Sequence, residues 1–399
     1  MPESRPYTNQ ALVDLLREHG DLNDPRVNAA FSAVPREKFL PGFPLDQVYT
    51  DQPVTVRADM RGETLCCANM PSMIAHMLSL AQLHEGQNVL HIGTGTGYTA
   101  ALIQHIIGDD GHITTLEIDR DIANTTADNL VRAGYGAVHV VHKDGAEGYA
   151  PRAAYDRIIA SVGIWDMPLP WITQLKPNGR IIAPIWIDGL QVCAVFTIQP
   201  DGTLYAQEMM PSAYIYIRGL AAGPTMQKMV GSTALKLIGD DLSRVDTAAL
   251  YMLLSSDQEQ CYLSVPLDTA SYWYGFLPYV MLNEPENDVF AIYTITQGQK
   301  AYGMEGEGFA LFTPASAAFV PYYGLGATHC FAGADAFLEL ETLLASWQQV
   351  GKPSIRQLRL RLIPKSQDKP HITRGKLYER HNHYLHAWIE ANAEIQADE

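Results

Sequence analysis

The chain has 399 residues, which is long enough for two or three domains with a large buried core. Forty-four acidic residues against 28 basic ones give a formal net charge of −16, which argues against nucleic acid and anionic membranes as main partners, because both attract basic surfaces. With 47% hydrophobic and 18% charged residues, the composition is that of a globular protein rather than a disordered one.

Cysteine usage and the start of the chain indicate the compartment. The five cysteines include the adjacent pair Cys66 and Cys67, but they form no disulfide framework and no CxxC metal motif. The first residues are polar, and no stretch of about 18 apolar residues follows. We therefore expect a cytoplasmic protein with reduced thiols, no metal and no membrane partner.

The first half of the chain predicts an α/β fold. Leu12, Leu16, Val27 and Phe31 are spaced for the apolar faces of one or two short N-terminal helices. Further on, apolar runs alternate with amphipathic segments and predict buried strands at residues 88–92, 112–118, 137–142, 156–160 and 179–185. Such alternation is typical of a Rossmann-like parallel sheet with helices on both faces, which binds ligands at the carboxyl ends of its strands. Residues 192–198 and 213–217 predict two more strands, paired antiparallel at one edge.

The pattern changes after residues 221–224, which read AAGP and are the candidate linker. We expect a catalytic domain at residues 1–222 and an accessory α+β domain at residues 223–399. The second domain should contain helices at residues 248–254 and 334–349, and strands at residues 289–296, 308–312 and 357–363.

The chain between residues 352 and 380 is basic, with about nine Lys or Arg and two acidic residues. Arg359 and Arg361 alternate with leucines, as on a strand with one solvated face. The alternative interpretation is a docking surface for an acidic peptide, formed by Arg356, Arg359, Arg361 and Arg374.

The clearest local motif is VLHIGTGTGY at residues 89–98, an apolar strand followed by a glycine-rich turn and a helix from Tyr98. Glycines such as Gly93, Gly95 and Gly97 let the backbone approach a ligand, and a helix start offers unpaired N–H groups. The motif predicts a nucleotide-like cofactor bound along this turn, Thr94 included. A tight strand-to-helix turn without a ligand also needs glycine and is the alternative.

Two carboxylates at neighbouring strand ends support a cofactor. Glu117, followed by Ile118, ends the next predicted strand, where a carboxylate can accept both ribose hydroxyls. A dinucleotide fold would need a small residue where Tyr98 stands, so an adenosine without phosphates, as in S-adenosylmethionine, fits better. Asp144 and Gly145 follow the third strand, where they could meet the adenine amino edge, although an Asp at such a place is often a helix cap.

Residues 10–220 resemble the protein-L-isoaspartate O-methyltransferases. The matching segments, in order, are VPREKFLP (34–41), YTDQP (49–53), GETLC (62–66), the glycine turn, Glu117, Asp144-Gly145, YDRII (155–159) and LKPNGR (175–180). The resemblance implies transfer of a methyl group from S-adenosylmethionine to a peptide carboxylate, leaving S-adenosylhomocysteine. It places Asp51, Thr64, Cys66 and Cys67 in the catalytic region, with Thr64 and the backbone N–H groups of a substrate loop holding the carboxylate.

The chain departs from the family pattern at three places. His91 stands where the family has an acid that helps to anchor the methionine amino group, so we place it in the cofactor site, while a hydrogen-bonded core histidine is the alternative. Cys66 replaces the serine of the substrate loop, and Cys67 and Ala68 replace the two residues after it. No neighbouring group obviously activates these thiols, so we interpret them as pocket lining. The third departure is the long C-terminal addition.

Three functions are compatible with this sequence. We favour a peptide-tailoring enzyme that esterifies an Asp of a ribosomally made precursor peptide, leading to succinimide (aspartimide) and isoaspartate, as in two-domain relatives beside lanthipeptide or graspetide assembly enzymes. The second is general repair of isoaspartyl proteins. The third is a non-catalytic scaffold that binds peptides with a methyltransferase fold. A carboxylate is ionised near neutral pH, so neither enzymatic reaction needs a general base.

Overall fold

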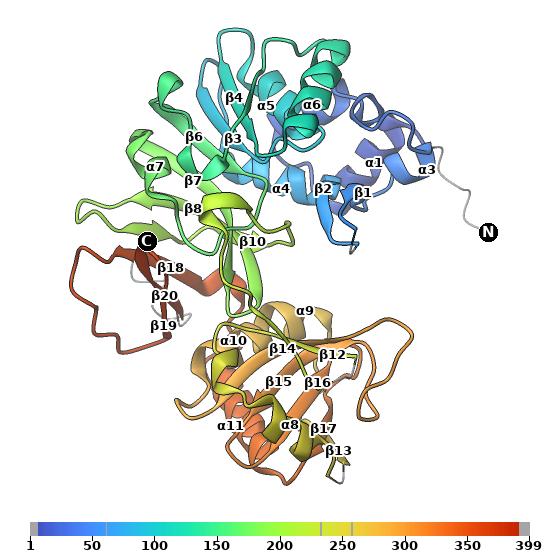
Figure 1. Cartoon of the computed structure of the whole chain (residues 1–399), viewed down its shortest axis with the longest axis vertical. Helices are drawn as coiled ribbons and strands as arrows, with labels where there is room; N and C mark the ends of the chain where they lie inside the picture. Colours follow the sequence, from blue (N-terminus) through green and yellow to red (C-terminus); the bar gives the residue numbers. More distant parts are fainter. Residues whose placement is uncertain (1–6, 61, 232–233, 257, 391–399) are drawn as a thin grey trace. The chain divides into compact units, whose positions relative to one another are not determined.

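The computed structural model describes residues 7–60, 62–231, 234–256 and 258–390. It divides into two compact units (Figure 1). Among the described residues, unit 1 comprises the chain up to Ile185, then Val192–Gly223 and Arg380–His383; unit 2 comprises Trp186–Gln191, those between Pro224 and Glu379, and residues 384–390. The main break therefore lies beside the predicted linker. Two short segments depart from a single cut at residue 222, because Trp186–Gln191 belongs to unit 2 and Arg380–His383 belongs to unit 1.

Unit 1 begins with short helices that bury one face each. Thr8 caps α1 and Asp24 caps α2 by accepting backbone N–H groups, as is typical of helix starts. The N-terminal elements are α1 (Asn9–His19), α2 (Pro25–Ala33), η1 (Arg36–Phe39), α3 (Leu45–Val48), the hairpin of β1 (Val54–Ala58) and β2 (Thr64–Ala68), and α4 (Pro71–Ala81).

The centre of unit 1 is a parallel sheet, which confirms the predicted fold class. Its strands are β3 (Asn88–Ile92), β4 (His112–Glu117), β5 (His139–His142), β6 (Tyr155–Ala160) and β7 (Leu175–Ile187), in the order β5-β4-β3-β6-β7. These apolar runs form strands because side chains on both faces are buried, as the zero exposure of Val89, Leu90 and Ile158 illustrates.

Helices α5 (Tyr98–Ile107) and α6 (Arg120–Ala133) lie along one side of the strands, and α7 (Leu169–Thr173) lies at the β6 and β7 end (Figure 1). The 3-10 turns η2 (Gly145–Glu147) and η3 (Ala150–Arg152) connect β5 to β6. β8 (Leu190–Ile198) follows β7 through a two-residue turn in which Asp188 and Gly189 both have positive φ, the turn that suits a twisted hairpin.

One predicted strand of unit 1 is wrong. β8 pairs antiparallel with β9 (Leu204–Ala206) and β10 (Met209–Pro211), whereas residues 213–217 form no strand. That segment makes a single parallel bridge, between Tyr216 and Gly163. Alternating apolar side chains are typical of a strand, but in this segment Ile215, Tyr216 and Ile217 line a pocket.

Unit 2 contains an antiparallel sheet and helices. The strands are β11 (Gln227–Met229), β12 (Leu235–Ile238), β14 (Val289–Ile295), β15 (Glu307–Phe312), β16 (Ala317–Pro321), β17 (Ala327–Phe331) and β13 (Gln258–Tyr262), in that spatial order. The helical elements are η4 (Gly219–Ala221) at the end of unit 1, and then η5 (Leu242–Arg244), α8 (Thr247–Leu254), α9 (Thr269–Ser271), η6 (Tyr272–Phe276), α10 (Leu277–Asn283), α11 (Asp335–Gln349) and η7 (Ile355–Gln357). The predicted α+β character is therefore confirmed.

The basic C-terminal segment has the expected solvated face only in part, because Arg359 is buried and Arg361 is half-buried. It forms β18 (Leu358–Pro364), β19 (Lys376–Glu379) and β20 (His383–Ile389). Arg359 is only 9% exposed and its Nε lies 2.8 Å from a carboxylate oxygen of Glu390. Arg374 lies over the ring of Trp388. Arg359 is therefore too buried to belong to the predicted docking surface for an acidic peptide, whereas Arg356 is exposed.

Within the described residues no helix is long and apolar enough to cross a membrane, and no group of three His, Cys, Asp or Glu side chains could hold a metal ion. All five cysteines are free thiols.

Candidate functional site

The glycine-rich turn forms the floor of a pocket at the carboxyl end of β3. Gly93 and Gly95 both have positive φ, and a Cβ on Gly93 would lie 2.8 Å from Cγ1 of Val162. Residue 93 must therefore be glycine, because the turn passes so close to Val162 after the end of β6. Gly93, Thr94, Gly95 and Tyr98 line the pocket, and Gly97 packs against α6.

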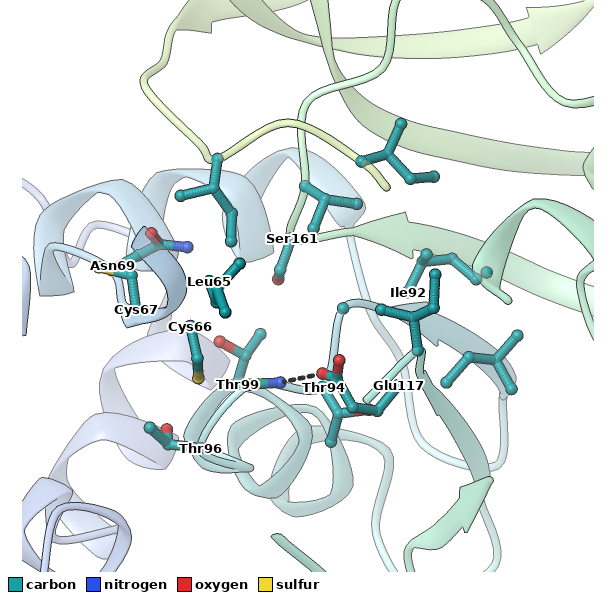
Figure 2. Close-up of a pocket in the computed structure, with 18 of the residues that line it drawn as sticks. Leu65, Cys66, Cys67, Asn69, Ile92, Thr94, Thr96, Thr99, Glu117 and Ser161 are labelled. Atoms are coloured by element: carbon teal, nitrogen blue, oxygen red, sulfur yellow. Dashed lines mark hydrogen bonds between the residues drawn. The ribbon is translucent and has the colours of Figure 1, made fainter. Parts of the chain in front are cut away.

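Glu117 faces the same pocket from the end of β4. Its side chain is 6% exposed, Oε2 accepts the Gly95 N–H at 3.1 Å, and Oε1 accepts the Asp119 N–H at 3.2 Å. Figure 2 shows this carboxylate beside Thr94, directed into the space around which the pocket side chains lie. Burial raises the pKa of Glu117 above its ordinary value, and the two N–H groups oppose that rise. A carboxylate with lone pairs left over is suited to a ribose diol.

The third strand end contributes backbone rather than a free side chain. Gly145 and Ile118 line the pocket. Both oxygens of Asp144 are engaged, since Oδ1 accepts the Ala146 N–H at 2.9 Å and Oδ2 accepts the Leu220 N–H at 2.8 Å. Asp144 is therefore a helix cap that also anchors residue 220, and its contact with an adenine stays a prediction.

The segment of residues 215–218 closes another side of the pocket, and the sequence reasoning missed it. The Gly163 N–H donates to the Ile215 carbonyl at 2.7 Å, and the Ile217 N–H donates to the Gly163 carbonyl at 2.9 Å. Arg218 forms an ion pair of 2.5 Å with Asp119. Residues 215–218 all line the pocket. These contacts hold the segment near the ends of β4 and β6, and no local sequence motif predicts them.

The expected substrate loop is a strand. Residues Thr64–Ala68 form β2, and this strand is paired with β1, so part of its backbone N–H groups serve the hairpin. Cys66, Cys67 and Ala68 line the pocket, whereas Thr64 lies outside it with its hydroxyl 3.5 Å from that of Thr55. The carboxylate-holding role of Thr64 therefore stays a prediction.

Cys66 is a pocket wall and not an activated thiol. Its side chain is buried, and burial with the neighbouring Glu117 charge raises its pKa to about 12. Burial also raises the pKa of Cys67. A thiol that stays protonated near neutral pH is a poor nucleophile. Figure 2 shows Cys66 of β2, Glu117 of β4 and Ser161, which follows β6, around one common space.

Arg36 fixes the position of β2, and no sequence motif pointed to this role. It has no exposed surface, and its guanidinium donates to five backbone carbonyls, those of Val48, Thr50, Gln52, Ala68 and Asn69. Asp51 lies in the same region and accepts the Ser72 N–H at 2.9 Å, near the start of α4. Asp51 is thus a helix-capping residue here, outside the pocket lining.

His91 lies behind the pocket rather than in its lining. It is fully buried, with Nδ1 2.9 Å from the Thr115 hydroxyl and Nε2 2.8 Å from the Ser161 hydroxyl. Burial lowers its pKa to about 3, so the ring is neutral at physiological pH. Of the two roles considered for His91, the geometry matches the hydrogen-bonded core histidine, which reaches the pocket through Ser161.

Comparisons with known proteins identify the family to which the chain belongs. Residues 7–221 match the profile of the family "Protein-L-isoaspartate(D-aspartate) O-methyltransferase (PCMT)". A protein-L-isoaspartate O-methyltransferase of Thermococcus sibiricus is 38% identical over 187 residues, which are 46% of this chain and 81% of that protein. The protein-L-isoaspartate O-methyltransferase of Methanopyrus kandleri is 32% identical over 211 residues, which are 53% of this chain and 91% of that protein.

A solved structure of a protein-L-isoaspartate O-methyltransferase has a TM-score of 0.51 and 23% identity, and the match covers 88% of this chain and 96% of that one. At this identity the likeness concerns the fold alone. Because the match covers 88% of this chain, it extends beyond residue 221, where the family profile ends, into unit 2. From the family profile and these relatives, the chain belongs to the protein-L-isoaspartate O-methyltransferase family and is an S-adenosylmethionine-dependent carboxyl O-methyltransferase.

Proposed function

We propose that this enzyme methylates the free carboxylate of isoaspartyl residues in proteins and peptides, as the first step of their repair. The observation that carries the proposal is the shared pocket: the β2 residues at the family's substrate position border the same space as the glycine turn and Glu117. Acceptor and methyl donor can therefore meet in it. The relatives named for this activity support the same substrate class.

The residues present fit S-adenosylmethionine. Glu117 would accept the ribose hydroxyls, and the backbone at Gly93 and Gly95 would pass under the sugar, with residue 93 so close to Val162 that it has no room for a Cβ. Bound S-adenosylmethionine supplies an electrophilic methyl group. We assign the cofactor contacts to the pocket lining, with His91 acting through Ser161.

The pocket side chains orient the acceptor and exclude water; they need not remove a proton, because the acceptor carboxylate is already ionised. The thiols of Cys66 and Cys67 have raised pKa values and stay neutral, so they add no negative charge that would repel an incoming carboxylate. Asn69, at the end of β2, presents an amide to the same space (Figure 2) and is our candidate for contacting the acceptor.

A second function, tailoring of a precursor peptide at an ordinary Asp, is favoured by one observation. Cys66, Cys67 and Ala68 all line the pocket, so the departures from the family pattern stand where the acceptor is held. The accessory unit gives less support to tailoring than the sequence indicated, because the fold of a solved protein-L-isoaspartate O-methyltransferase matches 88% of this chain.

The test is mass spectrometry with the full chain, S-adenosylmethionine and three peptides: a generic one with isoaspartate, the same with aspartate, and an Asp-containing peptide encoded beside the gene. Methyl ester on the first alone supports repair. Methyl ester, or loss of water through succinimide, on the third alone replaces repair with tailoring. No product on any peptide, with S-adenosylhomocysteine bound normally, leaves the non-catalytic scaffold. A Glu117→Ala chain is the negative control.

A further inference from the structure

The turn between β19 and β20 belongs to unit 1, although its flanking strands lie mostly in unit 2. Residues 380–383, which are this turn and the first residue of β20, contact Trp165 and Asp166, which follow β6. His383 and Asp166 are 217 positions apart in sequence, yet they form one of the most buried polar contacts of the unit, with exposed fractions of 0% and 7%.

Asp166 is held by three donors. Its Oδ1 accepts Nδ1–H of His383 at 2.7 Å and the Met167 N–H at 2.8 Å, and its Oδ2 accepts the Asn382 N–H at 2.6 Å. Nε2 of His383 has no hydrogen-bond partner among the described residues. Among the described residues, the imidazole of His383 therefore makes one hydrogen bond, the donation to Asp166, and the fully buried ring must keep the orientation that makes it.

A second contact clamps the neighbouring residue. The guanidinium of Arg380, 2% exposed, lies 4.8 Å from the ring centroid of Trp165, within the range of a cation–π interaction. On another side, a Cβ on Gly223 would lie 2.6 Å from Cβ of Trp165, so the backbone of residue 223 passes directly against the indole. Trp165 is thus held by the Arg380 guanidinium and by close packing against residue 223, beside Asp166 with its three hydrogen-bond donors.

The other end of this loop is a wall of the cofactor pocket. Ser161 and Val162 line the pocket, Ser161 contacts His91, and Gly163 binds residues 215 and 217 of the opposite wall. Between Val162 and Asp166 lie three residues, which leave little slack in the chain. A displacement of Asp166 would therefore move the pocket wall and the segment of residues 215–218 with it.

We propose that His383 is a positioning residue for cofactor binding: by holding Asp166 it keeps residues 161–163 in the place where they line the pocket. Residues 380–383 then serve methyl transfer itself and not the choice of peptide. The inference rests on the cofactor half of the proposed function and is independent of which carboxylate accepts the methyl group.

The first experiment measures the dissociation constant of S-adenosylhomocysteine by calorimetry for full-length variants. We expect His383→Leu, which lacks the donor, to bind at least about tenfold more weakly, and His383→Asn, which restores a donor near the Nδ1 position, to stay within about threefold. His381→Asn, in the same turn but exposed, is the matched control and should equal the wild type. KM for S-adenosylmethionine should rise in the Leu variant while KM for the peptide does not.

A second measurement needs no variant. Because coupling is reciprocal, S-adenosylhomocysteine should slow amide hydrogen exchange in the wild-type chain at residues 161–166 and also at residues 380–383. The proposal is overturned if exchange slows around the pocket but not at residues 380–383, or if a folded His383→Leu chain binds S-adenosylhomocysteine within twofold of the wild type. Should His383→Leu fail to fold, the exchange experiment alone decides.

Discussion

The hydroxyl of Ser161 lies 2.8 Å from Nε2 of His91, so a pocket-lining residue is held by a buried imidazole on the neighbouring strand. The hydroxyl of Thr115 contacts the other ring nitrogen at 2.9 Å and is itself 2.8 Å from that of Thr94. A neutral ring with two hydroxyl partners is satisfied in the core. The relationship links the strand interior to the pocket without bringing the imidazole into it.

This arrangement predicts acid sensitivity. The folded-state pKa of His91 is lowered to about 3, against about 6.5 when unfolded, so the unfolded chain binds the extra proton first. The stabilisation by neutral His91 is fully present above about pH 6.5 and is lost as the pH falls. Between about pH 6.5 and 5 we expect a loss of up to about 2 kcal/mol in unfolding free energy that His91→Gln does not show.

Urea unfolding at several pH values measures this difference, and His112→Gln, at an exposed position of β4, is the control that should follow the wild type. Parallel curves for the wild type and His91→Gln would contradict the assignment.

Glu117 should dominate cofactor affinity. Replacing it with Gln removes the charge that ribose hydroxyls would hydrogen-bond, so we expect S-adenosylhomocysteine to bind weaker by about 1–3 kcal/mol. Since burial raises the pKa of Glu117, affinity in the wild type should decline with acid earlier than for an ordinary glutamate. Calorimetry across pH tests both points. Asp128→Asn removes an exposed carboxylate from α6 and should change neither; equal effects of the two variants would refute the role of Glu117.

Cys66 should be replaceable. Its thiol stays protonated because the pKa is raised to about 12, so Cys66→Ser should keep kcat within a few-fold, and neutral iodoacetamide should modify Cys66 slowly in the native protein. Peptide mapping after alkylation, with the unfolded chain as reference, measures the reactivity. A loss of activity of a hundredfold or more in the serine variant would reopen covalent catalysis.

Arg36 should matter for stability more than any exposed arginine. Arg36→Met leaves five carbonyls without their donor, and we expect the unfolding free energy to fall by about 3 kcal/mol or more. Arg120→Met, at an exposed position, should cost less than about 0.5 kcal/mol. Denaturant titration compares the two. Similar midpoints would show that the five carbonyls find other partners.

Local patterns predicted much of unit 1. The run at residues 88–92 became β3 with the predicted bounds, and the helix after the glycine turn starts at Tyr98, as expected. These features are readable because burial on both faces demands a continuous apolar run, and because glycine marks the tight turn.

The contacts that complete the site were not readable. Arg36, Asp166 and His383 act through partners far away in sequence, and their spacing carries no periodic signal. Residues 213–217 have the alternation of a strand, yet tertiary contacts with Gly163 fix them as a pocket wall. For Thr64–Ala68, the resemblance indicated a loop, and pairing with β1 made it a strand.

The contact between Asp166 and His383 also bears on the order in which the protein is made. At about 5–20 residues per second, a ribosome needs roughly 10–45 seconds to cover the 217 positions from one partner to the other. During this interval the nascent catalytic unit has a carboxylate without its imidazole donor. If His383 positions residues 161–163 as we propose, the cofactor pocket takes its final form only after the β19–β20 turn has been made, and the growing chain is a candidate for chaperone binding until then.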